Sequence, residues 1–215
     1  YDMVISGQAR IDLEDNIISS RPYEKRSFFG SDIKDTLLPM LIGSNPSEHD
    51  SISVSACGVL YRTSIIIQHS LSFKSEREYI SEDLLFNIEY INHCRSIVLL
   101  DICGYYYRMN QNSLTTSYRK DRFTKTKYIY EVQKEMLINI GVYEQCKYRL
   151  MKQFFIYLRL CISQENTKLS NLHINDAIRH ISTICHDTLV GKLIDEYPVY
   201  KLGIRQQIYI RLIKT

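Results

Sequence analysis

Two neighbouring carboxylates, Glu82 and Asp83, are the residues of this chain whose type and position best suit proton transfer. They follow Ser81 and precede an apolar helical pattern, so they should lie in the first turn of a helix. A carboxylate there can accept the proton of a bound hydroxyl if its geometry and pKa are suitable. Acidic residues in a first turn also stabilise any helix through the helix dipole, so the pair alone leaves both interpretations open.

A candidate anion-binding group stands further along the chain. Arg108 ends an aromatic segment, 104–107, and small polar residues, Asn112 and Ser113, follow it. A planar guanidinium with small hydrogen-bonding side chains beside it suits a diphosphate. A solvated arginine at the end of a strand is the alternative interpretation.

Other familiar sites are not indicated by the sequence. The histidines and the six cysteines lack the spacing of a metal site, and no glycine-rich phosphate loop is present. We interpret the cysteines as buried free thiols of a reducing cytoplasm. The acidic segment 12–15 is interpreted as a turn rather than a metal site.

The composition is that of an ordinary globular protein. Of 215 residues, 45 % are hydrophobic and 24 % are charged, which argues against a wholly disordered chain. The net charge of +3 is small and dispersed, so nucleic-acid binding is not expected. No apolar run reaches the roughly 18 residues of a membrane span.

The first part of the chain predicts a mixed α/β arrangement. A strand at 3–5 should stop at Gly7, and 8–30 should form edge strands or a loop. The remaining expected elements are a helix at 31–41 disturbed by Pro39, a strand-like segment at 51–62, a short helix from Thr63, and a helix from Glu82 with Leu84, Leu85, Ile88 and Ile91 buried. Strands at 96–100 and 102–108 are separated only by Asp101, so they form either two strands or one bent strand.

The second part of the chain predicts helices only. We expect them at 121–140, ended by Gly141, and at 143–162, 175–190 and 201–214, with Phe123, Ile129, Val132, Met136 and Ile140 on the buried face of the first. The last segment carries four cations and no acid among apolar residues. Such a pattern is typical of a helix packed on its neighbours or of an interfacial helix on anionic lipid.

Several motifs together resemble the C-terminal half of family-two inverting glycosyltransferases, the bacterial enzymes of capsule, O-antigen and exopolysaccharide assembly. The motif Ser-Glu-Asp-Leu-Leu-Phe at 81–86 is followed by Gly-Tyr-Tyr-Tyr-Arg at 104–108 and Ser-Leu-Thr at 113–115. Cys-Gly-Val-Leu-Tyr-Arg at 57–62 and the opening Tyr-Asp-Met-Val-Ile-Ser-Gly are also similar to segments of that family, although a tryptophan common near the former is missing.

The resemblance implies the fold and the roles of the candidate residues. Residues 1–118 would be part of a nucleotide-diphospho-sugar-binding (GT-A type) α/β domain, and 119–215 a variable helical appendage. Asp83 would be the general base that takes the proton of the acceptor hydroxyl, and Glu82 would orient the acceptor or the base. Arg108, and the small polar residues at 112 and 113, would hold the leaving diphosphate.

The resemblance also implies partners and a missing part. The donor-binding half with its Asp-x-Asp motif is absent, so we expect a fragment that binds no metal alone, although Mg²⁺ or Mn²⁺ would bridge the diphosphate in the complete enzyme. Expected partners are a nucleotide-diphospho-sugar and a glycan or lipid-linked acceptor, with self-association through exposed sheet edges. The expected location is cytoplasmic, with peripheral contact to the inner face of the membrane through 201–214. The alternative is a non-catalytic helical module that binds a partner protein or a membrane surface.

Overall fold

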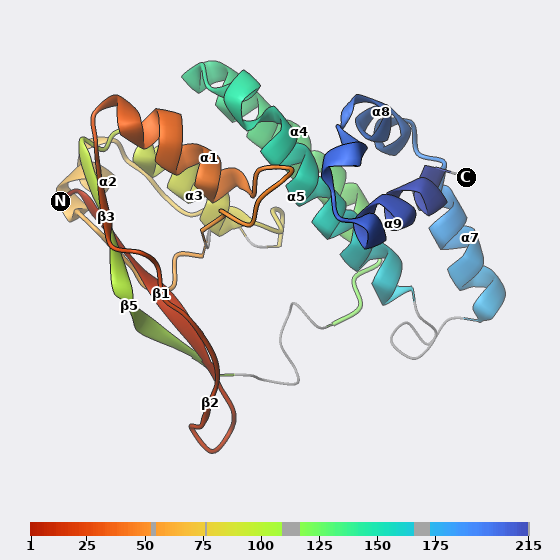
Figure 1. Cartoon of the computed structure of the whole chain (residues 1–215), viewed down its shortest axis with the longest axis horizontal. Helices are drawn as coiled ribbons and strands as arrows, with labels where there is room; N and C mark the ends of the chain where they lie inside the picture. The colour runs from red at the N-terminus through yellow and green to blue at the C-terminus, as the bar shows by residue number, and fades with distance from the viewer. Residues whose placement is uncertain (53–54, 76, 109–116, 166–172, 215) are drawn as a thin grey trace.

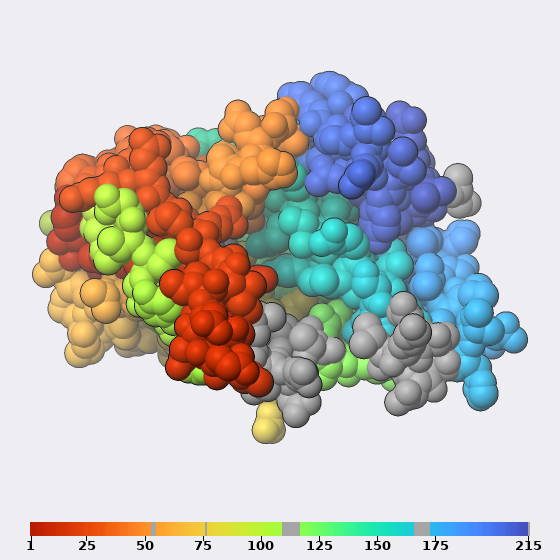
Figure 2. All heavy atoms as spheres, turned by 60° about the horizontal axis from the view of Figure 1, so that its bottom comes forward, coloured from red at the N-terminus to blue at the C-terminus, as the bar shows by residue number. Residues whose placement is uncertain are grey.

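The fold is known from a computed structural model, which describes residues 1–52, 55–75, 77–108, 117–165 and 173–214. Figure 1 shows a twisted sheet at one end of the molecule, helices α1 and α3 beside it, and the later helices beyond them. Figure 2 shows the same sequence of parts as an elongated body. This arrangement confirms the expectation of a mixed α/β part that is followed by a helical part.

The sheet combines one parallel pair of strands with three antiparallel pairs. Its strands are β1 (Met3–Ile11), β2 (Ile17–Arg21), β3 (Arg26–Phe29), β4 (Val59–Tyr61) and β5 (Ser96–Arg108). The order is β2-β1-β5-β3, and β4 also pairs with β1. The parallel pair is β1 with β5, in which Met3 lies opposite Ile97. The segment 51–62 was expected to be strand-like, but only Val59–Tyr61 pairs in the sheet among its described residues.

One predicted strand boundary was wrong. Strand β1 does not stop at Gly7 but continues to Ile11. A Cβ atom at Gly7 would lie 2.3 Å from the carbonyl oxygen of Arg21, so glycine is required there by the close approach of the hairpin. Of the two alternatives at Asp101, the structure has the single strand: Asp101 lies exposed within β5, and the register of β5 with β1 shifts near Gly7.

The short helices match the predicted segments in position. The helix expected at 31–41 consists of a π-helical turn, η1 (Ile33–Leu37), and α1 (Leu38–Ile42). Pro39 lies in the first turn of α1, where a missing N–H is tolerated. Helix α2 spans Thr63–Gln68, and α3 spans Glu82–Ile91 with all four predicted apolar residues buried.

The later helices are α4 (Arg122–Ile140), α5 (Tyr143–Gln164), α7 (Ile174–Cys185), α8 (Thr188–Glu196), the 3₁₀ turn η2 (Val199–Lys201) and α9 (Ile204–Lys214). Gly141 ends α4 with a φ of 82°, as predicted. The single helix expected at 175–190 is two helices, because Asp187 caps α8 by accepting a hydrogen bond from the N–H of Leu189. Of the predicted face of α4, only Ile129 is buried, whereas Phe123, Val132, Met136 and Ile140 are half-buried; Leu137, which was not predicted, is fully buried.

One apolar core runs through both parts of the chain. It includes Phe28 of the sheet, Leu38 of α1, Tyr90 of α3 and Phe154 of α5, all at most 2 % exposed. The six cysteines are free thiols as expected, but only Cys146 and Cys161 are buried and the other four are half-buried. No described helix is both long enough and apolar enough to cross a membrane.

Candidate functional site

Asp83 lies half-buried in the first turn of α3, beside the loop that precedes β4. Its Oδ2 accepts a hydrogen bond of 3.0 Å from the N–H of Ala56. Within the described part of the chain, its Oδ1 accepts no hydrogen bond. One oxygen is therefore fixed by the backbone, and the other has no hydrogen-bond donor among the described residues.

A tyrosine lies beside this carboxylate. Burial, and then the nearby charge of Asp83, raises the pKa of the Tyr61 phenol. The phenol therefore stays protonated and donates a hydrogen bond of 2.7 Å to Oδ1 of Asn87. Tyr61 thus joins β4 to α3 next to Asp83.

The loop that holds Asp83 is itself fixed on the sheet. The carbonyl oxygen of Gly58 accepts hydrogen bonds from the N–H and the hydroxyl of Ser6, at 2.9 and 2.8 Å. Gln8 Nε2 donates to the carbonyl oxygen of Cys57 at 2.9 Å. The small residues of this segment predicted a close backbone contact, and Gly58 makes it with Ser6 and Tyr105. Strand β1 therefore positions Asp83 through the loop at 55–58.

Gly58 should tolerate no side chain without loss of stability. Its φ is +80°, and a Cβ would lie 2.9 Å from Oγ of Ser6 and 3.3 Å from Cβ of Tyr105. We expect Gly58→Ala to lower the free energy of unfolding by about 2–4 kcal/mol, measured by urea denaturation. Gly141→Ala is a matched control, because Gly141 has a similar φ of +82° and nothing within 4 Å of its Cβ position. Equal losses in the two variants would show that the contact with the sheet is not tight.

The two carboxylates of the pair, Glu82 and Asp83, lie beside different parts of the structure. Glu82 is also half-buried, and its charge, after burial, contributes to a raised pKa of the Tyr157 phenol in α5. Ser81 stands at the N-cap position as predicted, but its hydroxyl lies 3.2 Å from the Tyr157 oxygen and makes no capping bond to α3. Glu82 therefore lies toward α5, and Asp83 toward the loop before β4.

Arg108 ends β5 and contacts the turn between β1 and β2. Its Nη2 lies 2.5 Å from Oδ1 of Asp15, and its Nη1 lies 3.4 and 3.3 Å from the carbonyl oxygens of Asp12 and Leu13. Arg108 stands three residues beyond Tyr105, about 10 Å along the strand. The structure gives no contact between Arg108 and Asp83 among its described residues.

The two small polar residues predicted beside Arg108, Asn112 and Ser113, lie outside the described residues.

The acidic segment 12–15 forms a turn as predicted, in which Asp12 Oδ1 accepts hydrogen bonds from the N–H groups of Glu14 and Asn16. The side-chain amide of Asn16 also donates to Asp12 Oδ2. These hydrogen bonds lower the pKa of Asp12, and the bond from the Asn16 side chain has the largest effect. In the part of the chain that the structure describes, no three acidic, histidine or cysteine side chains could hold a metal ion.

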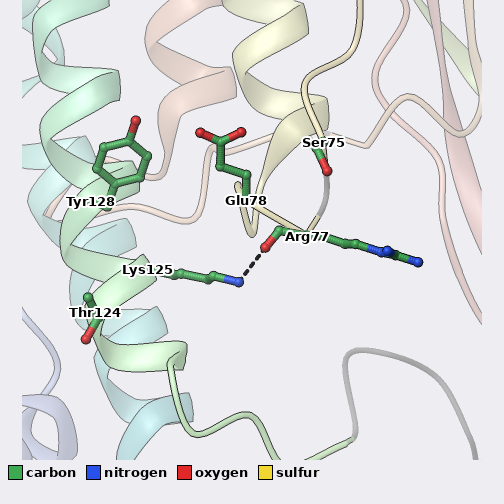
Figure 3. Close-up of a pocket in the computed structure, with 6 residues that line it drawn as sticks. All are labelled: Ser75, Arg77, Glu78, Thr124, Lys125 and Tyr128. Carbon is green, nitrogen blue, oxygen red and sulfur yellow. Dashed lines mark hydrogen bonds between the residues drawn. The ribbon is translucent and has the colours of Figure 1, made fainter.

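An open hollow of about 530 Å³ lies between the segment before α3 and the first turns of α4. Ser75, Arg77, Glu78, Thr124, Lys125 and Tyr128 line it (Figure 3). The Lys125 ammonium donates to the carbonyl oxygen of Arg77, whose side chain points away from Lys125. The sequence indicated only that this segment is polar, because its partners on α4 are almost fifty residues away.

Comparison with known proteins gives a distant, partial similarity. The chain is 26 % identical over 130 residues to the Bacillus subtilis (strain 168) protein named "Putative glycosyltransferase EpsH". The aligned part is 60 % of this chain and 38 % of that protein, so the chain matches well under half of its relative's length. No protein-family model matches the chain.

Proposed function

We propose that this chain forms the acceptor side of an inverting glycosyltransferase, with Asp83 as the general base. The observation that carries the proposal is the fixed carboxylate: the backbone of Ala56 holds Oδ2, and Oδ1 accepts no hydrogen bond from another described residue. The partial similarity to a protein named as a glycosyltransferase supports the same reaction class.

In the proposed reaction, Asp83 takes the proton of an acceptor hydroxyl as that oxygen attacks the anomeric carbon of the donor sugar. The new glycosidic bond forms on the face opposite the breaking bond to the diphosphate, so the anomeric configuration inverts. The Ala56 N–H keeps the carboxylate oriented, and Glu82 orients the acceptor from the α5 side. Asp83→Asn tests the assignment, because an amide can still accept the Ala56 N–H but cannot take a proton.

Arg108 is proposed to hold the leaving diphosphate. It would first have to leave Asp15, and both of these side chains are about half-exposed or more, at 49 % and 68 %. An exposed ion pair of this kind contributes only about 0–1 kcal/mol. A diphosphate with at least two negative charges can therefore displace Asp15.

The hollow beside α4 is proposed to receive the acceptor. Glu78 and Ser75 offer hydrogen-bonding groups for sugar hydroxyls, and Tyr128 offers an aromatic ring. Glu78 is five residues before Asp83, so their Cα atoms lie no more than about 18 Å apart. The donor sugar and its metal-dependent binding are assigned to a part of the transferase outside these 215 residues.

The role of Arg108 can be separated from that of its ion pair. In the complete transferase, Arg108→Gln should raise the KM for the nucleotide sugar about tenfold, because one charge-assisted contact is lost. Asp15→Asn removes the same ion pair but frees the guanidinium, so KM should fall or stay unchanged. If Asp15→Asn impaired donor binding as much as Arg108→Gln does, the ion pair would have a structural role. The proposal that Arg108 binds the diphosphate would then be wrong.

A further inference from the structure

We propose that η2 and α9 dock this protein on the surface of an anionic lipid bilayer. Large apolar side chains are exposed at Tyr200, Ile204, Ile208 and Leu212, each at least 53 %. The last three are spaced by four residues, so they form one stripe that covers roughly 80° of the helix surface. We call these four residues the apolar stripe.

The opposite face of α9 already has a partner. Ile210 and Ile213 are only 3 % and 4 % exposed and belong to the core. Figure 1 shows α9 lying next to α5 and α8. The helix is therefore held by one face, while the apolar stripe faces solvent at the cost of exposing apolar surface.

Basic residues flank the stripe. At 3.6 residues per turn, Arg205 lies along one edge of the apolar stripe and Arg211 along the other. Lys201 precedes the helix, and no acidic residue occurs in 199–214. Lys214 forms an ion pair with Asp195, so its charge is already compensated. An apolar stripe with cations at both edges is the pattern of a helix that lies in the interface of an anionic membrane.

A cleft continues from the Arg205 edge. It has a volume of about 470 Å³ and lies among α5, α9 and the loop 44–49. Its charged lining residues are all basic, namely Lys152, Arg159 and Arg205, and the lining includes no carboxylate. The Lys152 ammonium already donates to carbonyl oxygens of the 44–49 loop, so Arg159 and Arg205 are the cations that remain for a ligand. The cleft can therefore receive a phosphate headgroup while the apolar stripe contacts the acyl chains.

The charge pattern favours lipid over a protein partner or a second copy of the chain. The exposed stripe of α7, with Ile174 and Ile178, offers a comparison within the same molecule. There Arg179 pairs with Asp176 at 3.3 Å, so the neighbouring charge is compensated. Only α9, among the described helices, combines exposed aliphatic residues with uncompensated cations on both edges.

Co-sedimentation with vesicles tests the proposal and does not depend on glycosyl transfer. The 215-residue chain should bind vesicles of phosphatidylglycerol and phosphatidylcholine, and should bind pure phosphatidylcholine at least tenfold more weakly. Ile208→Ser with Leu212→Ser should weaken binding about tenfold or more. Arg205→Gln and Arg211→Gln should each weaken it about fivefold, and salt should reduce what remains.

The matched control is Ile174→Ser with Ile178→Ser, which removes similar exposed apolar surface from α7 and should leave vesicle binding unchanged. Circular dichroism and gel filtration of each variant show whether it is folded and monomeric. The proposal is overturned if the wild-type chain binds no vesicles, if it binds neutral vesicles equally well, or if the α7 and α9 variants lose binding alike. A dimer that depends on Ile208, without lipid binding, would assign the stripe to a second copy and would also overturn it.

Discussion

Asp83→Asn should reduce glycosyl transfer by the complete enzyme about 10²- to 10⁴-fold, the range for removal of a general base. The amide can still accept the 3.0 Å hydrogen bond from Ala56, so the loop before β4 should keep its place. The loss should appear in kcat, because the proton is transferred only in the transition state. The rate of nucleotide-sugar turnover, monitored through the release of the nucleoside diphosphate, measures this loss of kcat.

Two further variants make this result specific. Glu82→Gln should cost about tenfold, because Glu82 lies toward Tyr157 and is assigned only an orienting role. Asp101→Asn, an exposed position on β5, should leave turnover unchanged. If Asp83→Asn retained more than a tenth of wild-type kcat, Asp83 would not be the base, and the acidic pair would be only a helix start.

Arg149→Ala should lower the free energy of unfolding by about 2–3 kcal/mol, the largest effect we expect from a single ion pair in this chain. The Arg149 guanidinium on α5 bonds both carboxylate oxygens of Asp50, at 3.0 and 2.6 Å, and the carbonyl oxygen of Gly43 at 2.7 Å. Only 13 % and 25 % of the two side chains is exposed, so removing one leaves the other poorly solvated. Urea denaturation measures the loss, and the midpoint of thermal unfolding should fall by about 5–10 °C.

This effect should depend on pH in a defined direction. Partial burial raises the pKa of Asp50, but the hydrogen bonds from Arg149 and from the N–H of Asn45 outweigh it and place that pKa below its usual value. A lowered folded-state pKa means that the pair stabilises the protein above the unfolded pKa of about 4 and loses this stabilisation as pH falls through the folded value. The difference between wild type and Arg149→Ala should therefore be full at pH 7 and shrink below pH 4.

An exposed ion pair provides the control. Lys134 and Glu131 lie 3.7 Å apart on α4, with side chains 31 % and 48 % exposed. Lys134→Ala should cost less than about 0.5 kcal/mol at any pH. A loss for Arg149→Ala no greater than that of Lys134→Ala would show that the α5 contact with the 43–50 loop contributes little to stability.

Periodicity and helix-end chemistry were enough to predict much of the fold. The stripe of α3 and the end of α4 at Gly141 follow from spacing of apolar residues and from a glycine that permits a positive φ. The close contact at Gly58 followed from a run of small residues. These signals are local, so the sequence carries them directly.

What could not be predicted depends on residues that are distant in the sequence. A glycine in a strand can end it or permit a close contact, and only the position of Arg21 shows that Gly7 does the latter. The ion pair of Arg108 joins residues 93 positions apart, and the hollow beside α4 joins segments that are about fifty positions apart. The structure therefore places a loop and a strand near the predicted carboxylates, and periodicity reveals neither contact.

The anomeric configuration of the product tests the central claim most directly. Proton NMR of the glycoside, formed by the complete enzyme from the nucleotide sugar that it consumes, reports that configuration as the product first appears. A single base, Asp83, requires one displacement, so the product should have the configuration opposite to that of the donor. A product that retains the donor configuration, formed at a rate that Asp83→Asn does not change, would contradict the assignment.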